Sequence, residues 1–525
     1  MQKHNTSKKN YKKKLGKFPT GICTNDMTYE DCELAILRHA VEKTEKMQGQ
    51  KMADSPEIKK ILIIVEDFII HKKLLCYGGT AINNILPKYA QFYNREIEIP
   101  DYDFYSANAL DDAKELADIY YAAGYKDVEA KAGVHMGTFK VFVNFIPIAD
   151  ITYMNKQLYD ALLKESVLIS GIHYVPPDFL RMSMYLELSR PAGDVSRWEK
   201  VLKRLTLLNE HYPMKLGKNC DRIAIPDQDK QYESVYITTR DVLIDQGVIF
   251  FGAYAMSLYS NYISRDKNEN NYSNFDVIYD NPNRIATILK EHLEREKIKN
   301  IKITSHPAIG ELLPEHVEVS VGGRPIVFIY KPVACHNYNK ILRGNKEINI
   351  ASIDTILTFY LCFLYINLPH YNKDRLACMS KFLFEIQQKN RIEQRGILKR
   401  FSIDCYGKQP TLETMRSEKA EKYIELNKNR AGKEYEMWFL KYVPDKNKPL
   451  SEYGKSLSKK FKSESVEIDS KSSDSTTKQE IKVDQEHVPN VEITKTIRRH
   501  KNRKATKKTA TFMDLFRSRR RTQKL

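Results

Sequence analysis

The pattern of apolar and polar residues predicts two helices near the start of the chain. In residues 28–48, Asp31 and Glu33 lie toward the beginning and Lys43 and Lys46 toward the end, as the helix dipole favours. In residues 57–73 the apolar side chains recur at helical spacing and share one face. That face is formed by Ile58, Ile61, Leu62, Val65 and Ile69.

Short apolar runs then indicate strands alternating with helices. Residues 73–77 are typical of a short buried strand, and a helix is expected to start near Thr80. Two strand-like runs and a long helix from about Asp178 follow. The apolar stretch 353–368 predicts a buried helix, since it is under twenty residues long and contains polar side chains. The chain is therefore expected to have a mixed α/β (α+β) fold.

A weak internal repeat indicates that this fold occurs twice. CYGGTAINNILPKY at 76–89 resembles FFGAYAMSLYSNYI at 250–263, and PDYDFYS at 100–106 resembles SNFDVIY at 273–279. IPIADITYMN at 146–155 is then aligned with YKPVACHNYN at 330–339. Three matches in the same order favour duplication over chance, and 525 residues exceed one compact core.

Charge and composition complete the predicted domain organisation. Residues 1–17 hold seven lysines and no acid, and residues 495–525 hold thirteen Lys and Arg against one acid. Because the whole chain carries +18, the residues between these two ends are close to neutral. The basic ends either bind a polyanion such as RNA or are simply solvated. The predicted parts are a basic arm and helix (1–50), a first domain (51–215), a second domain with a helical C-terminal part (216–443) and a disordered Ser/Lys/Arg-rich tail (444–525).

The eight cysteines contain no C-x-x-C pair, and the Lys-rich start does not resemble a secretory signal. We therefore expect free thiols in a reducing compartment, no structural zinc and no secretion.

Candidate chemistry begins at the turn Gly78-Gly79-Thr80. Two glycines permit a tight turn with close backbone approach, and the N-terminus of a helix favours a phosphate. Thr80 could add a hydroxyl contact. On their own such turns are more often structural than phosphate-binding.

Three carboxylates strengthen the argument. Asp101 and Asp103 lie two residues apart, so in a strand they project to the same face. Asp150 comes at the end of the apolar run in residues 139–152, where a carboxylate is costly unless it is paired or binds a metal. Carboxylate oxygens are suitable ligands for Mg²⁺ or Mn²⁺. Two such ions per site are typical of phosphoryl transfer. A lone Asp-x-Asp would more often be a surface pair.

With these residues the sequence resembles the polymerase-beta-like nucleotidyltransferases, and more closely the poly(A) polymerase catalytic subunits of poxviruses and giant viruses. CYGGTAIN at 76–83, PDYDFYS, ADIT at 149–152 and the block 181–213 carry the resemblance, over about 60–400. It implies that Asp101, Asp103 and Asp150 bind two metal ions and catalyse, with Asp150 assisting deprotonation of the primer hydroxyl. It also implies that Gly78, Gly79 and Thr80 hold the triphosphate.

The second copy is expected to be degenerate. In the predicted alignment Asn274, Asp276 and Cys335 take the places of Asp101, Asp103 and Asp150, and Ala253 takes that of Gly79. Asn is a neutral ligand and Cys a poor one for Mg²⁺, which indicates lost metal binding and a structural or RNA-guiding role.

The predicted function is template-independent addition of AMP from ATP to mRNA 3′ ends. A terminal transferase with another base or acceptor, and a catalytically inactive RNA-binding scaffold, remain alternatives. Four basic residues are candidates to line the cleft, or are solvated charge: Arg197, Lys200, Lys203 and Arg204. The expected partners are ATP, an RNA 3′ end and either a second copy or a processivity subunit, and no membrane. The resemblance implies the host cytoplasm at the viral factory, with packaging in the virion as a further expectation.

Overall fold

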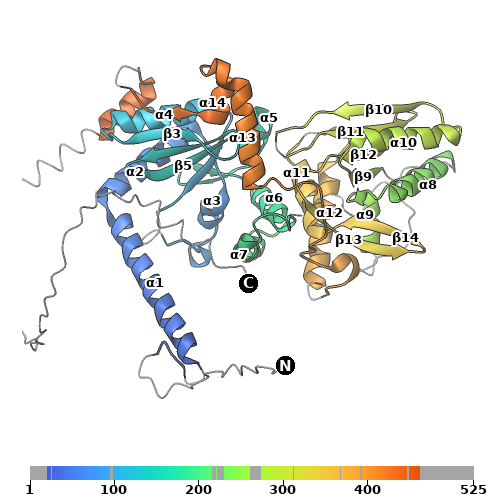
Figure 1. The fold of residues 1–525 in the computed structure, drawn as a ribbon, viewed down its shortest axis with the longest axis horizontal. Coiled ribbons are helices and arrows are strands. Elements are labelled where there is room, and N and C mark those ends of the chain that lie inside the picture. The colour runs from blue at the N-terminus through green and yellow to red at the C-terminus, as the bar shows by residue number, and fades with distance from the viewer. Residues whose placement is uncertain are drawn as a thin grey trace, which may run out of the picture. The chain divides into compact units, whose positions relative to one another are not determined.

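In a computed structural model, the structure describes residues 21–24, 27–94, 99–215, 220, 230–260, 274–310, 312–366, 368–390, 393–445 and 449–461. The two basic ends and most of the predicted C-terminal tail lie outside these residues. Two eight-stranded mixed sheets with associated helices make up the described chain (Figure 1). The predicted mixed α/β fold is confirmed.

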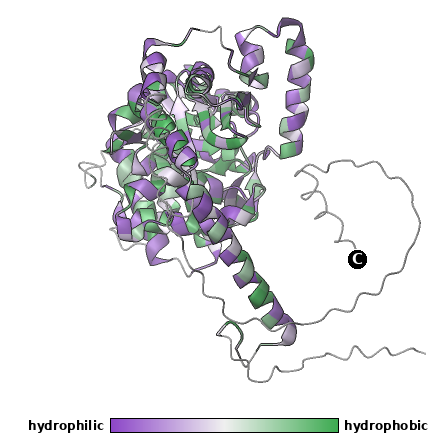
Figure 2. Cartoon of the chain, turned by 90° about the vertical axis from the view of Figure 1, so that its left-hand side faces the viewer, coloured by the Kyte–Doolittle hydropathy of each residue, from purple (hydrophilic) through white to green (hydrophobic). Residues whose placement is uncertain are grey.

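The predicted N-terminal helices are present. Helix α1 (Tyr29–Asp54) begins with a capping box between Thr28 and Asp31, and α2 (Pro56–Lys72) buries the predicted apolar face apart from Leu62. Only Cys32 of α1 is buried, and apolar side chains such as Leu37 and Val41 are exposed. Figure 2 shows that hydrophobic and hydrophilic residues are mixed along this helix. Its stability therefore rests on its own capping and its contact with α2.

The first sheet has the strand order β16-β3-β4-β5-β2-β1-β7-β6. Its strands are β1 (Leu75–Cys76), β2 (Tyr102–Ser106), β3 (Val128–Ala132), β4 (Thr138–Val143), β5 (Ile146–Tyr153), β6 (Val167–Ile169), β7 (Ile172–Tyr174) and β16 (Lys441–Tyr442). Its helices are α3 (Gly78–Ile85), α4 (Ala109–Ala122), α5 (Lys156–Lys164), α6 (Pro177–Leu188) and α7 (Trp198–His211), with 3-10 turns η1 (Lys88–Ala90) and η2 (Val195–Arg197).

The second sheet has the order β10-β11-β12-β9-β8-β14-β13-β15. Its strands are β8 (Ile249–Phe250), β9 (Phe275–Ile278), β10 (Ile301–His306), β11 (His316–Val321), β12 (Arg324–Tyr330), β13 (His336–Arg343), β14 (Lys346–Ala351) and β15 (Cys405–Tyr406). Its helices are α8 (Lys230–Asp245), α9 (Ala253–Ser260), α10 (Pro282–Arg295), α11 (Ile353–Phe363) and α12 (Lys373–Lys389), with η3 (Gly396–Leu398).

The two sheets repeat one topology. The run β3-β4-β5-β2-β1-β7-β6 matches β10-β11-β12-β9-β8-β14-β13 strand for strand, and the extra strands β16 and β15 lie at opposite ends. The pairings agree as well: β1 is antiparallel to β2, and β8 to β9, while β2 is parallel to β5, and β9 to β12. The helices α6 and α11, which follow β7 and β14, pack against each other. The repeat in the sequence is therefore a repeat of structure.

The apolar run 139–152 forms two strands instead of one. Asn144 and Phe145 have φ angles of 50° and 64°, and this two-residue turn joins β4 to β5 as an antiparallel hairpin. Asp150 consequently lies within β5, and the expectation that it ends the run was wrong. Asn144, which favours such turns, is the signal for it in the sequence, and the apolar Phe145 obscured that signal although it is 81% exposed.

The C-terminal segment returns to the first sheet. Helices α13 (Leu412–Leu426) and α14 (Lys433–Phe439), joined by η4 (Asn427–Asn429), lead into β16, which pairs with β3. A further helix spans 452–461 and buries Leu457 and Phe461. The prediction of a disordered tail from residue 444 is therefore wrong for residues 449–461, because the few apolar side chains of this segment are buried in a core.

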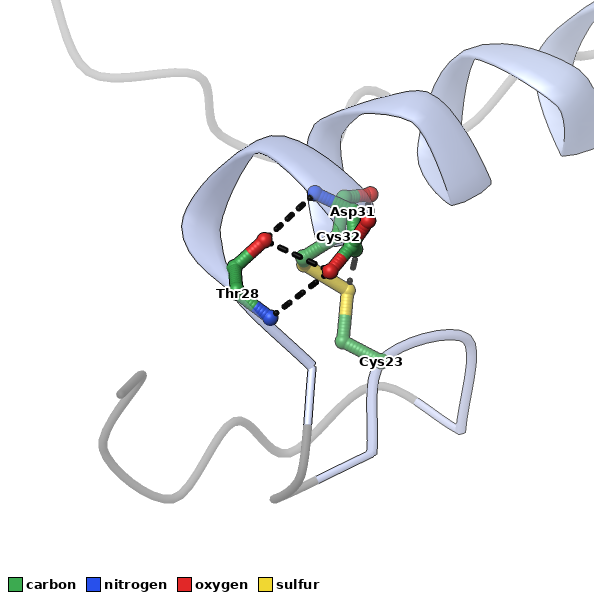
Figure 3. Close-up of a disulfide and its surroundings, with 4 residues drawn as sticks. All are labelled: Cys23, Thr28, Asp31 and Cys32. Carbon is green, nitrogen blue, oxygen red and sulfur yellow. Dashed lines mark hydrogen bonds between the residues drawn. A yellow bond between two sulfur atoms is a disulfide. The ribbon is translucent and has the colours of Figure 1, made fainter. Parts of the chain in front are cut away.

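The cysteines also differ from expectation. Disulfides join Cys23 to Cys32, Cys220 to Cys378 and Cys335 to Cys405, and of the described cysteines only Cys76 and Cys362 are free thiols, both buried. Figure 3 shows the first bond beside the Thr28–Asp31 capping box. The absence of C-x-x-C pairs could not exclude partners 9, 70 and 158 residues apart. Within the described part of the chain, no helix is both long and apolar enough to cross a bilayer.

Candidate active site

The Gly-Gly turn connects β1 directly to α3, which begins at Gly78. Gly78 has a φ of +74°, and a Cβ there would lie 2.4 Å from Oδ2 of Asp103. The Tyr77 amide donates to the Asp103 carbonyl at 3.0 Å, which holds the turn against β2. Glycine is thus required because the backbone passes directly over a carboxylate.

Thr80 serves the same junction. Its hydroxyl donates to the backbone carbonyl of Asp101 at 2.8 Å and is nearly buried. This bond fixes the entry to β2, two residues before Asp103. The threonine proton is therefore engaged within the protein, and a triphosphate contact by Thr80 stays a prediction.

The structure brings the three predicted carboxylates together. Asp103 on β2 and Asp150 on the adjacent parallel strand β5 are direct partners in the register, and Asp101 precedes β2 by one residue. Burial first, and then Asp101 and Asp150, raise the pKa of Asp103 to about 7. Burial and then Asp150 also raise the pKa of Asp101. Repulsion between neighbouring carboxylates therefore adds to the effect of burial at both residues.

Lys140 was not predicted, and it is the main cation beside these acids. It lies on β4 directly opposite Asp150, and its Nζ contacts the Asp150 carboxylate. It also opposes the upward pKa shifts of Asp101 and Asp103. A hairpin register places it, so spacing along the chain gave no signal for it.

The donor set suits a hard divalent cation. Within the described residues, no group of three His, Cys, Asp or Glu side chains forms a ready-made metal cage. The three carboxylates nonetheless offer oxygen ligands, and Mg²⁺ commonly binds one or two of these and completes its shell with water and substrate phosphates. Their mutual repulsion in a partly buried site favours a bound cation further.

Two pairs of basic residues lie near the start of α7, the lysines Lys200 and Lys203 and the arginines Arg197 and Arg204. Lys200 and Lys203 are exposed, and Lys203 pairs with Glu199 at 2.6 Å on the solvent side. Arg197 pairs with Glu187 at 3.1 Å and lowers the pKa of Asp103 against the other effects. The structure thus supports a place near the acids for Arg197 and solvated charge for Lys203.

Arg204 is the basic side chain closest to the glycine turn. A Cβ on Gly79 would lie 2.9 Å from its Nη1, and its Nη2 donates to the Tyr93 hydroxyl at 2.6 Å. The guanidinium also lies 4.9 Å from the Phe92 ring centroid. Asn83 holds this loop, since its Oδ1 accepts from the Phe92 and Tyr93 amides at 2.8 Å each. A rigidly held cation therefore borders the turn.

A cavity of about 240 Å³ opens next to Asp101. It is lined by Thr80, Asn83, Asn84, Tyr93, Ile99, Pro100 and Asp101. The turn, the acids, Arg204 and this cavity together form one candidate site at the start of α3.

Replacing Gly78 with alanine should destabilise the protein by about 2–4 kcal/mol, because left-handed backbone strain adds to overpacking. Gly344 is the matched control, with a φ of +62° and no atom of the described residues within 4 Å of an added Cβ. Gly344→Ala should cost only the backbone term, about 1–2 kcal/mol. Thermal unfolding of both variants tests this, and equal losses would contradict the close approach to Asp103.

The second copy keeps the turn and one acid, Asp276, but has lost the other two acids. A Cβ on Gly252 would meet Oδ2 of Asp276 at 2.1 Å, so Gly252 and Asp276 correspond to Gly78 and Asp103. Tyr371 donates to Asp276 Oδ1 at 2.5 Å, and burial raises the pKa of Asp276 to about 7. Asp276 is sealed inside the protein and is not available to a ligand.

The register corrects one predicted correspondence. Asp276 pairs across the parallel strands with Phe328, as Asp103 pairs with Asp150, so Phe328 and not Cys335 replaces the third acid. Glu318, opposite Phe328, takes the position of Lys140. The alignment of 146–155 with 330–339 was therefore wrong, because a short motif match cannot locate insertions. Degeneracy of the second copy is supported more strongly, since phenylalanine cannot bind a metal.

A strand, a glycine turn leading into a helix, and acids on two adjacent parallel strands are therefore the features that this site shares with the resemblance stated for the sequence. A crystal structure of the Megavirus polyadenylate synthase has this fold, with a TM-score of 0.68 and 22% identity over 85% of this chain and 92% of that one. A family model described as "Poly(A) polymerase catalytic subunit" matches residues 63–194, which include every predicted catalytic residue. The resemblance to that family is confirmed over this segment.

Curated relatives agree. A "Putative poly(A) polymerase catalytic subunit" of African swine fever virus (isolate Tick/Malawi/Lil 20-1/1983) is 34% identical over 180 residues, and one of Acanthamoeba polyphaga mimivirus is 30% identical over 223 residues. The matches cover 33% and 41% of this chain, and 38% and 37% of those relatives. The similarity thus spans less than half of each relative.

Proposed function

We propose that this protein is a template-independent poly(A) polymerase that adds AMP from ATP to RNA 3′ ends, those of mRNA in particular. The observation that carries the proposal is the meeting of Asp101, Asp103 and Asp150 beside the Gly78-Gly79 turn. The relatives' printed names and the family match over 63–194 support the same reaction.

In the proposed reaction the primer 3′ oxygen attacks the α-phosphorus of ATP. A new P–O bond forms, the bond to the β-phosphate oxygen breaks, and pyrophosphate leaves. The amides at the start of α3 and the Arg204 guanidinium face the triphosphate side. Positioning and charge neutralisation account for most catalysis of phosphoryl transfer.

Asp101 and Asp103 would hold two Mg²⁺ or Mn²⁺ ions, and Asp150 one of them at the primer side. When bound, the ions neutralise the triphosphate and acidify the attacking hydroxyl. Asp150 accepts that proton, and Lys140 must release the Asp150 carboxylate for it to act. The second copy contributes no metal ligand in this proposal.

The word "catalytic subunit" in the relatives' names indicates a partner for those proteins. A processivity subunit or a second copy is accordingly proposed here. A place in the host cytoplasm and in the virion stays a prediction.

Extension of a labelled RNA primer with each of the four NTPs tests the proposal. We expect long products with ATP and Mg²⁺, and none after EDTA. Efficient use of UTP or another NTP in place of ATP would favour the terminal transferase of different specificity. No incorporation of any NTP would favour the RNA-binding scaffold.

Arg204→Ala should raise the KM for ATP by about 10- to 100-fold, because a charge-assisted contact to phosphate contributes about 1.5–3 kcal/mol. Lys203→Ala, its exposed neighbour paired with Glu199, is the matched control and should leave KM unchanged. Steady-state kinetics on both variants measures the difference. Equal KM values for the two variants would show that Arg204 does not contact the nucleotide.

A further inference from the structure

A second cavity, of about 430 Å³, lies between α7 and α12. Leu202, Leu205 and Phe384 supply an apolar part, and Asn209, Gln388 and Arg400 supply polar groups. The volume falls in the range of small-molecule sites, about 300–1,000 Å³.

This cavity is separate from the candidate active site. Leu202, Leu205 and Asn209 recur at helical spacing and share one face of α7. Arg204, which borders the glycine turn, projects from the other face of the same helix. One helix therefore carries the nucleotide-side arginine on one face and this cavity on the other.

The polar side of the cavity is held by buried partners. Arg400 Nη2 and Gln387 Nε2 donate to Asp354 Oδ1 at 2.9 and 3.0 Å, and Asp354 is 1% exposed. Asn209 Oδ1 accepts from Nε of the fully buried Arg181 at 2.7 Å. These side chains are fixed before any ligand arrives.

The same network is not fully satisfied internally. Oδ2 of Asp354 and Nε of Arg400 find no hydrogen-bond partner among the described residues. Both atoms are enclosed, so a ligand would contact the exposed lining of the cavity and not these two atoms. The network therefore supports the wall of the cavity.

The charges indicate what kind of ligand fits. Asp354 neutralises Arg400, and Glu210 adds an acid to the lining, so there is no surplus positive charge for a phosphate. Phe384 offers an aromatic face, and the amide of the exposed Gln388 pairs a donor with an acceptor. The other two amides of the lining are already engaged, Gln387 with Asp354 and Tyr185, and Asn209 with Arg181. A flat, uncharged ring with hydrogen-bonding edges matches Phe384 and Gln388, and Asn and Gln pair with adenine in particular.

We propose that this cavity binds an adenine base, outside the active site, with Phe384 as the stacking surface and the Gln388 amide reading the base edge. The proposal deepens the proposed function, on which it rests. The base can come from the RNA strand upstream of its 3′ end or from a free nucleotide, since both present the same ring.

Photo-crosslinking with 8-azidoadenosine on the full chain, without divalent cations, tests the proposal. We expect label in peptides of α7 and α12, and label reduced at least about fivefold in Phe384→Ala, since one stacked base contributes about 1–3 kcal/mol. Gln388→Ala, at an exposed lining position, should reduce it as well, and Lys389→Ala should not. If Phe384→Ala fails to fold, Gln388→Ala carries the test.

Two competition arms identify the source of the base. Displacement by an oligoadenylate but not by AMP at equal base concentration assigns the site to RNA, and the reverse assigns it to a free nucleotide. Label confined to peptides around Gly78 and Asp101, or label unchanged in both variants, would overturn the proposal. Because crosslinking needs no turnover, failure of primer extension would reject the polymerase function without affecting this result.

Discussion

Asp103→Asn should lower the rate of AMP addition by about 10³-fold, the loss that follows removal of one strong electrostatic group from an active site. Asp103 is the central acid of the three, in register with Asp150 and two residues from Asp101. Asparagine keeps its shape but removes the charge that would bind a cation. Single-turnover extension of an RNA primer at saturating ATP measures the effect.

The same variant should fold at least as well as the natural protein. Burial and two neighbouring acids already disfavour the ionised form, which is why the pKa of Asp103 lies near 7. The control is Asp276→Asn, the corresponding change in the second copy, which should leave the rate within about threefold because Tyr371 seals Asp276 from any ligand. Equal loss of activity in the two variants would contradict the division into an active and a degenerate copy.

The double variant Leu457→Ala/Phe461→Ala should lose about 4 kcal/mol or more of unfolding free energy, since each truncation leaves a cavity in a core. Both side chains are 5% exposed and belong to the same core as α2 and α4. Their helix also places Ser451 on Glu115 at 2.6 Å and Lys460 on Asp67 at 3.1 Å. The C-terminal segment therefore stabilises the first sheet.

Ile424→Ala on α13 provides the control for that variant. It lies in the same C-terminal segment but is 78% exposed, so its truncation should change stability by less than about 0.5 kcal/mol. Denaturant unfolding measures all three proteins. A double variant as stable as the control would mean that residues 452–461 do not dock on the first sheet.

Features that depend on neighbouring residues in the chain could be predicted. The apolar face of α2, the buried helix α11 and the Gly-Gly turn followed by an Asp-x-Asp pair all follow from local spacing. The repeat was also visible, because its glycine and aspartate, Gly252 and Asp276, are retained for a steric reason that survives the loss of metal ligands.

Features that depend on strand register could not be predicted from the sequence. Lys140 faces Asp150 only because a two-residue turn sets the register of β4 against β5. Phe328 was missed as the third position of the second copy for the same reason, and Cys335 was chosen in its place. The pairing of β16 with β3 joins residues more than 300 positions apart, and no local pattern can predict such a contact.

Primer extension by the Asp101→Ala protein, run beside the natural protein with ATP and Mg²⁺, tests the central claim most directly. The claim predicts long adenylate products for the natural protein and none for the variant, with both proteins equally folded. Unchanged extension by Asp101→Ala would show that nucleotide transfer does not occur at these three acids.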